Sequence, residues 1–455
     1  YSPPGGTSQT SQSGRVVTLV AVIDRGEEEG GRVYVCDAGG TSWTAATNGS
    51  SQTKYLNSGV VIRSTVVNQV LYLFDGSNIR TYTASTNTVG DFVASNGNVP
   101  SGSSGTIFPE LCCTWRGRLI LSGLSTDPQN LFISKQGTPT DFNYSPSSTT
   151  PTQAVAGNVS VLGYIGDVVT GVAPFNDDVL TIFGDSTIWQ IKGDPMQGGQ
   201  AQRFSDGVGA AYGVSWCKDP FGTMYFFSNR CGIYAMAPGK QPIRMSQPID
   251  PLLADINTGT NVIRLAWIDR EQSLRVFVTP ASAAAAATHY TWEMRTGSWW
   301  QDEYPNAMNP TCVATFDGNR ASDRVTLIGS FDGYVRAIDM DATKDDGTNI
   351  ASEVWIGPIQ SDSMDDWMLY DLRSDLGEDS GDVSYTVHSG HTAEAALSSD
   401  GTTAKTWTAG SNRVSPTRRS GAAVYLKLTS VSRWNVERIR GRVSGLGKLR
   451  QRTTF

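Results

Sequence analysis

The chain has 455 residues, of which 48 are Gly and only 17% are charged. Its 39% hydrophobic content excludes wholesale disorder, and no apolar stretch approaches the roughly 20 residues of a membrane helix. Gly, Ser, Thr and Asn are abundant, while Leu, Glu and Lys are sparse. This composition argues against helical bundles and is typical of strands joined by tight turns.

The net charge of −7 is unevenly distributed along the chain. Residues 413–455 hold eleven Lys and Arg residues and one acid, Glu437, so this end carries +10 and the first 412 residues carry −17. An acidic body with a basic end favours assembly with a complementary surface over general nucleic-acid binding.

The N-terminal residues 1–14 form a Ser, Gly and Thr-rich arm, which we expect to become ordered only on a partner. From residue 15 to residue 360 one pattern then recurs: a short apolar strand, a polar turn, and a second strand that bears an aromatic residue. The first pair is 16–23 with 32–36. The later pairs are 66–74 with 79–82, 115–123 with 130–134, 175–184 with 187–191, 220–227 with 232–236, 273–278 with 289–294, and 325–329 with 334–338.

The spacing of these pairs predicts the fold class. Between the anchors the spacings are 48, 60, 45, 50 and 54 residues, the anchors being Val66, Thr114, Pro174, Asp219, Asp269 and Asp323. A period near 50 residues, with about four short strands in each unit, is the size of a β-propeller blade. We therefore predict an all-β protein whose residues 15–360 form a propeller of about seven blades. The alternative is a pair of β-sandwiches.

The pattern changes after residue 360, and we interpret residues 361–455 as a small antiparallel β-domain, sandwich-like in form. In residues 423–428 the apolar residues Val424, Leu426 and Leu428 alternate with polar ones, which predicts a half-buried strand. In residues 434–439 the apolar positions shift from even to odd numbers, which predicts a β-bulge.

The cysteines and histidines predict neither a disulfide scaffold nor a zinc site. None of the six cysteines is in a CxxC pair, and their density is too low for a disulfide-stapled secreted scaffold, so we interpret them as reduced. Adjacent Cys112 and Cys113 are expected on opposite faces of a strand. His388 and His391 lie three residues apart with Gly390 between them, which does not give a rigid zinc geometry.

No motif predicts catalysis or cofactor binding. The Asp-rich segment 339–347 could offer oxygen ligands to calcium, but it lacks the EF-hand order and is interpreted as a hairpin loop. We interpret three Asp-Gly pairs as hairpin turns rather than as paired catalytic carboxylates. They are Asp75-Gly76, Asp317-Gly318 and Asp332-Gly333. We therefore expect no catalytic residue, no cofactor and no metal.

Two groups of residues could bind a partner. Trp299, Trp300 and Trp355 could form a sugar or partner platform, although packing between blades is the simpler interpretation. The basic end is the stronger candidate for docking onto an acidic neighbour, with a charged edge strand or phosphate contact as alternatives. Its candidate residues are Arg433, Arg438, Arg440, Arg442, Lys448, Arg450 and Arg452.

Several segments together resemble the tail nozzle or tail hub proteins, also called stabilisation or tail-tubular proteins, of short-tailed bacteriophages. The resemblance is diffuse and covers roughly residues 110–455. It is carried by residues 115–119, 130–134, 137–142, 179–191, 222–236, 295–300 and 419–425.

The resemblance implies a propeller with tail-tube domains, in a ring of six copies around a DNA channel, and it implies no catalysis. We therefore expect a structural virion protein of the tail, assembled in the reducing cytoplasm of a bacterial host. It would join the head-side adaptor to the distal tail or fibre proteins and gate a channel for double-stranded DNA. The alternatives are a receptor-binding or baseplate propeller and a carbohydrate-active, sialidase-like propeller enzyme.

Overall fold

The computed structural model describes most of the chain, which divides into two compact units, Tyr1–Ile338 and Asp339–Phe455. The described residues are 18–26, 30–36, 42–48, 56–102, 107–157, 162–230, 232–317, 324–339, 341–360 and 365–445. The predicted arm, residues 1–14, lies outside them. Among the described residues no helix is both long and apolar enough to cross a membrane.

The first unit is a β-propeller, as predicted. Apart from one two-stranded ladder, its described residues form seven sheets in chain order, which we number blades 1 to 7. Blade 1 comprises β1 (Val20–Asp24), β2 (Gly31–Cys36) and β3 (Trp43–Ala45). Blade 2 comprises β5 (Arg63–Val67), β6 (Val70–Phe74), β7 (Ile79–Thr83) and β8 (Thr88–Asp91), and β4 (Thr47–Asn48) joins its outer edge. Blade 3 comprises β10 (Leu111–Trp115), β11 (Arg118–Ser122), β12 (Phe132–Ile133) and β14 (Val155–Ala156).

The remaining four blades follow the same plan. Blade 4 comprises β15 (Val169–Pro174), β16 (Val179–Gly184), β17 (Thr187–Lys192) and β18 (Ala201–Asp206). Blade 5 comprises β19 (Trp216–Lys218), β20 (Met224–Ser228), β21 (Gly232–Met236) and β22 (Ile243–Arg244). Blade 6 comprises β23 (Asn261–Ile268), β24 (Ser273–Pro280), β25 (Thr288–Glu293) and β26 (Ser298–Glu303). Blade 7 comprises β27 (Pro310–Phe316), β28 (Val325–Ser330) and β29 (Val335–Ala337).

Short elements connect the blades. A two-stranded parallel ladder joins β9 (Asn96–Gly97) to β13 (Asp141–Phe142). The helical turns are η1 (Pro195–Gln197), η2 (Gln247–Ile249), α1 (Asp250–Leu253) and η3 (Asn306–Met308).

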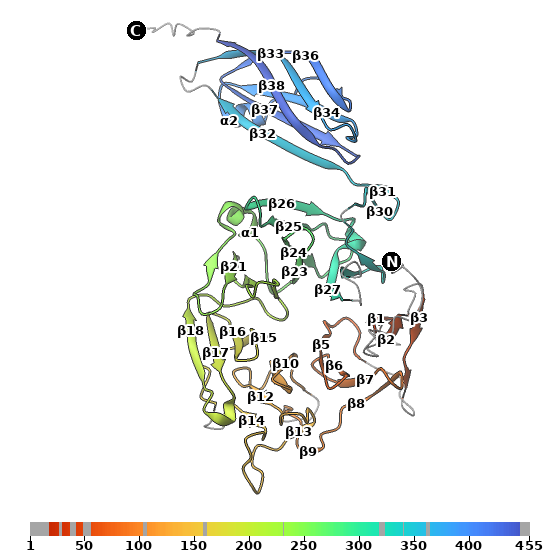
Figure 1. The fold of residues 1–455 in the computed structure, drawn as a ribbon, viewed down its shortest axis with the longest axis vertical. Helices are drawn as coiled ribbons and strands as arrows, with labels where there is room; N and C mark the ends of the chain where they lie inside the picture. Colours follow the sequence, from red (N-terminus) through yellow and green to blue (C-terminus); the bar gives the residue numbers. More distant parts are fainter. Residues whose placement is uncertain are drawn as a thin grey trace. The chain divides into compact units, whose positions relative to one another are not determined.

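The first strands of the blades surround a common axis. Strand β10 contacts β5 and β15, and β23 contacts β19 and β27. Figure 1 shows β5, β10, β15, β23 and β27 on the inner side of the first unit and β18 and β26 on its outside. Arg63, the first residue of β5, lies 3.2 Å from Glu110, which directly precedes β10, so these two inner strands begin at the same end of the axis.

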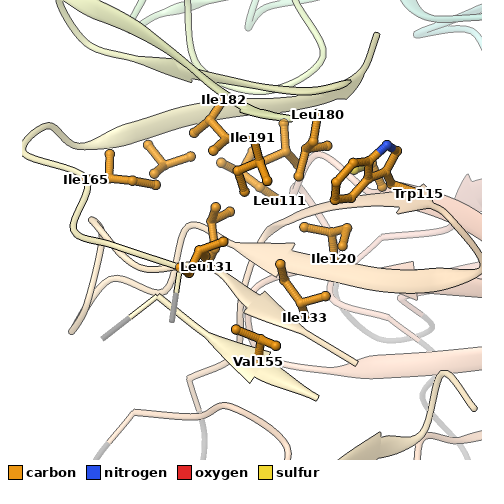
Figure 2. Packing of buried hydrophobic residues seen from close by; sticks show 14 residues of the cluster. Leu111, Trp115, Ile120, Leu131, Ile133, Val155, Ile165, Leu180, Ile182 and Ile191 are labelled. Carbon is orange, nitrogen blue, oxygen red and sulfur yellow. The ribbon is translucent and has the colours of Figure 1, made fainter. Parts of the chain in front are cut away.

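The blades are held together by apolar clusters between consecutive sheets. Leu180 and Ile182 of β16 pack toward blade 3, while Phe183 of the same strand packs toward blade 5. Figure 2 shows the cluster between blades 3 and 4, where Leu111, Trp115 and Ile120 meet residues of β16 and β17. A strand that is buried on both faces needs a continuous apolar run rather than strict alternation. This explains why these strands can be predicted from the sequence.

The adjacent cysteines confirm the predicted alternation. Cys113 belongs to the cluster between blades 3 and 4, whereas Cys112 packs against the cluster between blades 2 and 3. Burial raises the pKa of the Cys112 thiol to about 12. Within the described part of the chain, Cys112, Cys113, Cys217 and Cys312 are free thiols, and Cys231 lies outside it.

The second unit is a two-sheet antiparallel β-domain. One sheet has the order β32 (Ser352–Gln360), β37 (Ala423–Ser430), β34 (Val383–Gly390) and β35 (Lys405–Trp407), and the other has the order β36 (Gly410–Gly421), β33 (Trp367–Leu376) and β38 (Val436–Gly445). Helix α2 (Ala393–Leu397) follows β34. A small hairpin, β30 (Lys344–Asp345) and β31 (Thr348–Asn349), precedes the two sheets.

Two predictions for this unit are confirmed by its strands. Val424, Leu426 and Leu428 are buried in the core of the unit, while Tyr425 and Lys427 are half-buried on the other face of β37. In the β33–β38 ladder Asp375 pairs with Arg438 and Leu376 with Val436, so Glu437 is the extra residue of a bulge.

The boundary between the units lies earlier than the predicted residue 360. Contacts divide the chain at Ile338 and Asp339. The physical reason is that β32 pairs with β37, from Ser352 opposite Ser430 to Gln360 opposite Ala423. The segment that was assigned to the propeller is therefore an edge strand of the C-terminal domain.

Candidate functional site

The described basic residues of the predicted docking site lie on or just before β38. Arg433 precedes this strand, and Arg438, Arg440 and Arg442 are exposed on it. Lys448, Arg450 and Arg452 lie outside the described residues. Because β38 is an edge of the β36–β33–β38 sheet, which we call the basic sheet, its outer backbone groups face away from the ladder.

Several of these arginines bind acids of their own unit. Arg438 lies 2.6 Å from Asp375, and Arg442 lies 2.6 Å from Asp371, whose side chain is 3% exposed. Arg433 lies 3.3 Å from Asp341. The three arginines are therefore partly neutralised inside the unit, which the sequence-based interpretation did not foresee.

The net charge is also distributed differently between the two units than the sequence analysis expected. Residues 1–338 contain 27 acidic and 22 basic residues, a net charge of −5, whereas residues 339–412 contain 15 acidic and 3 basic residues, a net charge of −12. Most of the acidic excess thus belongs to the same compact unit as the basic end. The expected contrast between an acidic body and a basic end is mainly a contrast within the C-terminal unit.

Arg419 on β36 is half-buried and donates to the carbonyl oxygen of Gly401 at 3.3 Å. Three further arginines of the basic sheet have no carboxylate within ion-pair distance among the residues that the structure describes. They are Arg413 and Arg418 on β36 and Arg440 on β38, and all three are exposed. In the β33–β38 ladder Arg440 lies opposite another arginine, Arg373. The two edges of the basic sheet therefore carry positive charge that is available to an acidic surface.

The other sequence candidates do not form a site. His388 contacts the carbonyl oxygen of Ser399 at 2.8 Å through Nδ1, while His391 contacts Asp366 at 3.1 Å. Within the described ranges no group of three or more His, Cys, Asp or Glu residues could hold a metal ion. In segment 339–347, Asp346 and Gly347 have positive φ at the turn between β30 and β31, which confirms the hairpin interpretation; Met340 lies outside the described residues.

The tryptophans do not form one platform. Trp299 packs into the core between blades 5 and 6 and donates from Nε1 to the carbonyl of Met245, and Trp300 beside it is 51% exposed. Trp355 is in the other unit, where its ring lies 4.8 Å from that of His388 and Lys427 Nζ lies 5.1 Å from its centre.

The Asp-Gly turns are structural. Asp75 accepts hydrogen bonds from the backbone N–H groups of Asn57 and Ser77, and Gly76 has a φ of 84°. Asp332 binds Arg336 at 2.6 Å and accepts from Ser330 Oγ, and Gly333 has a φ of 79°. Both carboxylates are therefore already engaged in hydrogen bonds or an ion pair. Gly318 of the third turn lies outside the described residues.

A second candidate site, absent from the sequence-based predictions, lies at the mouth of the propeller axis. Arg63 opens β5 and Glu110 directly precedes β10, while Arg264 is the fourth of the eight residues of β23. Arg63 Nη1 lies 3.2 Å from Glu110 Oε2, to which Tyr212 Oη donates at 3.0 Å. The Arg63 guanidinium also lies 5.0 Å from the centre of the Tyr212 ring. Burial, followed by the charge of Glu110, raises the pKa of Tyr212.

A sequence signal for this site exists. Arg264 interrupts the apolar run Val262-Ile263-Arg264-Leu265-Ala266-Trp267, and a charged residue inside a buried strand requires a reason. Arg63 and Glu110 give no comparable signal, because each stands at the polar start of its strand.

A cavity of about 260 Å³ lies further along the inner strands of blades 5 to 7. Its lining includes Cys217, Lys218, Trp267, Thr315 and Arg324. The two charged groups are already engaged: Lys218 Nζ donates to the carbonyl of Pro174 at 2.9 Å, and Arg324 lies 2.6 Å from Asp269. Burial lowers the pKa of Lys218 and raises that of Cys217.

Comparisons with known proteins add little beyond this description. No protein-family model matches the chain, and no curated protein matches it. Among solved structures, a fungal alcohol oxidase of the AA5 family is similar at 10% identity, with a TM-score of 0.45 and coverage of 94% of this chain and 95% of that one. YCF48 is similar at 10% identity and a TM-score of 0.40, with coverage of 69% and 88%. The extracellular domain of a one-component system from B. thetaiotaomicron is similar at 11% identity and a TM-score of 0.43, with coverage of 86% and 55%.

Proposed function

We propose that the protein is a structural virion protein, the tail nozzle or hub of a short-tailed bacteriophage. It joins the head-side adaptor to the distal tail and, as a ring of six copies, forms the gated channel through which double-stranded DNA is retained and ejected. It performs no catalysis in this role, and it contacts the passing DNA without reading its sequence.

The observation that carries this proposal is the basic sheet. Its two edge strands are long, with 12 residues in β36 and 10 in β38, and both lie beside the ten-residue central strand β33. Exposed edges of this length are a liability in a monomer because their unpaired backbone groups can pair with any other strand. Arginines at the edges suppress indiscriminate pairing and leave the edges open to a chosen acidic partner.

The distribution of charge in the C-terminal unit suits a ring of identical copies. Residues 339–412 carry −12, and residues 413–455 carry +10. Head-to-tail association places the basic part of one copy against the acidic part of the next, which is the heterologous contact from which closed rings are built. The internal pairs Arg438–Asp375 and Arg442–Asp371 hold β38 against β33, so the edge is already formed before association.

The assembly state of the full chain tests the proposal. Mass photometry and electron microscopy of the purified protein, alone and with its adaptor and distal tail proteins, are expected to detect closed six-membered rings. A chain that stays monomeric and never associates with tail proteins contradicts it. Specific glycan binding by the monomer favours a receptor-binding propeller instead, and turnover of a glycan favours an enzyme.

A further inference from the structure

Arg264 is a buried cation that has no carboxylate partner among the residues that the structure describes. Its side chain extends from β23 in blade 6, and the residue is 9% exposed. Its Nη1 atom donates to the carbonyl oxygen of Ile263, the preceding residue, at 3.0 Å. Among the described residues no carboxylate lies within ion-pair distance of it, although a buried guanidinium ordinarily has one.

A second guanidinium, that of Arg63, adds positive charge close to Arg264. Arg63 has a side chain that is 10% exposed, and its Nε atom is buried with no hydrogen-bond partner among the described residues. Burial, followed by the positive charge of Arg63, lowers the pKa of Arg264 to about 10, so both groups stay charged at neutral pH. Glu110 is the carboxylate in contact with Arg63, and it is shared with Tyr212.

The backbone at Gly213 passes close to the Arg63 guanidinium. Gly213 has a φ of 100°, and its N–H donates to the carbonyl of Thr170 at 2.8 Å. A Cβ atom added at Gly213 would lie 3.2 Å from Arg63 Nη2. A larger residue would therefore crowd the guanidinium, and its positive φ makes glycine the suitable residue here.

We propose that the space between Arg264 and Arg63, beside the propeller axis, is an oxyanion-binding site, in which the two arginines together hold a phosphate or carboxylate group. A guanidinium presents its N–H donors in a planar fork that matches the oxygens of either group. An oxyanion between the two arginines supplies a counter-charge for Arg264, accepts from the two guanidinium groups, and leaves the Glu110–Tyr212 contact in place. The site belongs to the propeller alone and does not depend on the ring assembly proposed above.

The test measures binding of inorganic phosphate and of acetate to the full chain by calorimetry in buffer of low ionic strength. We expect saturable binding of one anion per chain. Arg264→Met and Arg63→Gln are each expected to weaken it by about tenfold or more, the size of one charged hydrogen bond. The matched control Arg203→Gln, which removes an exposed arginine paired with Asp206 on β18, is expected to leave the affinity unchanged within about twofold. A preference for phosphate assigns a phosphorylated ligand to the site, and a preference for acetate assigns a carboxylate.

Thermal unfolding supplies a readout that a purely structural arginine would not give. In buffer free of oxyanions, Arg264→Met is expected to unfold at the same temperature as the wild type or higher, because it removes an uncompensated buried charge. Phosphate is expected to raise the unfolding temperature of the wild type and of Arg203→Gln but not that of Arg264→Met. The absence of saturable binding of both anions, equal losses in all three variants, or a lower unfolding temperature of Arg264→Met without anion would each overturn the proposal.

Discussion

Arg118 and Asp194 form a buried ion pair that joins blades 3 and 4. The Nη2 atom of Arg118 lies 3.3 Å from both carboxylate oxygens of Asp194, and the two side chains are 0% and 7% exposed. Burial lowers the pKa of the Arg118 guanidinium, and the Asp194 carboxylate opposes this effect. Asp194 also accepts from the N–H of Met196 at 2.8 Å, so one carboxylate both caps η1 and fixes the neighbouring blade.

Removing this carboxylate should destabilise the propeller. We expect Asp194→Ala to lower the free energy of unfolding by about 3 kcal/mol or more, because it leaves the Arg118 guanidinium buried without a counter-charge. The matched control Asp206→Ala, which breaks the exposed pair with Arg203, should cost less than about 1 kcal/mol. Urea unfolding of the full chain, followed by tryptophan fluorescence, measures both changes. Equal losses in the two variants would contradict this role of the buried pair.

His289 should make the propeller less stable in acid. It is 1% exposed, Nδ1 accepts from the N–H of Val278 at 3.1 Å, and Nε2 therefore donates to Asn309 Oδ1 at 3.1 Å. Burial lowers the pKa of His289 below its ordinary value of 6.5, and Asn309 and Asp302 oppose the shift only in part. The unfolded chain thus binds the proton more readily, so stability is complete above about pH 6.5 and is lost as the pH falls through the folded-state pKa.

The measurement is the free energy of unfolding between neutral pH and about pH 5. The contribution of His289 has a slope of at most about 1.4 kcal/mol per pH unit, and His289→Gln should remove it. The side chain of His391 is 80% exposed, and His391→Gln should change the stability at neutral pH by less than about 0.5 kcal/mol. If the free energy of unfolding of the wild type and of His289→Gln changed identically with pH, protonation of His289 would not be the cause of the loss of stability in acid.

The position of the domain boundary can be tested with two fragments. Residues 339–455 contain all strands of both C-terminal sheets, whereas residues 361–455 lack β32. We expect the longer fragment to fold cooperatively. The shorter one should aggregate or unfold, because it exposes the ladder edge of β37 and removes Val354 from the core. Circular dichroism and sedimentation measure the difference, and two equally well-folded fragments would place the boundary at residue 360 after all.

The free arginines of the basic sheet should control assembly. Replacing Arg413, Arg418 and Arg440 together by Glu is expected to weaken association of the copies by about tenfold or more, because like charges then face each other across the contact. The stability of the unit should change by less than about 1 kcal/mol, since the three side chains are exposed. Arg203→Glu on the propeller is the control. Mass photometry over a range of protein and salt concentrations reports the effect, and unchanged assembly in the triple variant would remove the basic sheet from the interface.

Features that depend on local pattern could be predicted from the sequence. The hairpins and the number of repeats were readable because a strand buried on both faces, such as β16, needs a continuous apolar run between turn residues. The opposite faces of Cys112 and Cys113 follow from the two-residue period of a strand. The bulge at Glu437 was visible as a change in the parity of the apolar positions.

Features that depend on residues distant in the sequence were decided only by the tertiary structure. β32 belongs to the C-terminal unit because its partner, β37, lies more than sixty residues later, and nothing within β32 itself identifies that partner. For the same reason the sequence predicted Arg438 and Arg442 as docking residues without indicating their partners. In the structure, Asp375 and Asp371 of β33 form ion pairs with them.

The sequence by itself therefore determined an all-β repeat and its strand periods, since these are set by side-chain alternation within a few residues. Folding around a common axis decided which charges meet. It brings Arg63, Glu110 and Tyr212 together at one mouth of the propeller, although they come from three different parts of the chain. It also buries Arg264 without a carboxylate among the described residues, and no local pattern of charge predicts that outcome.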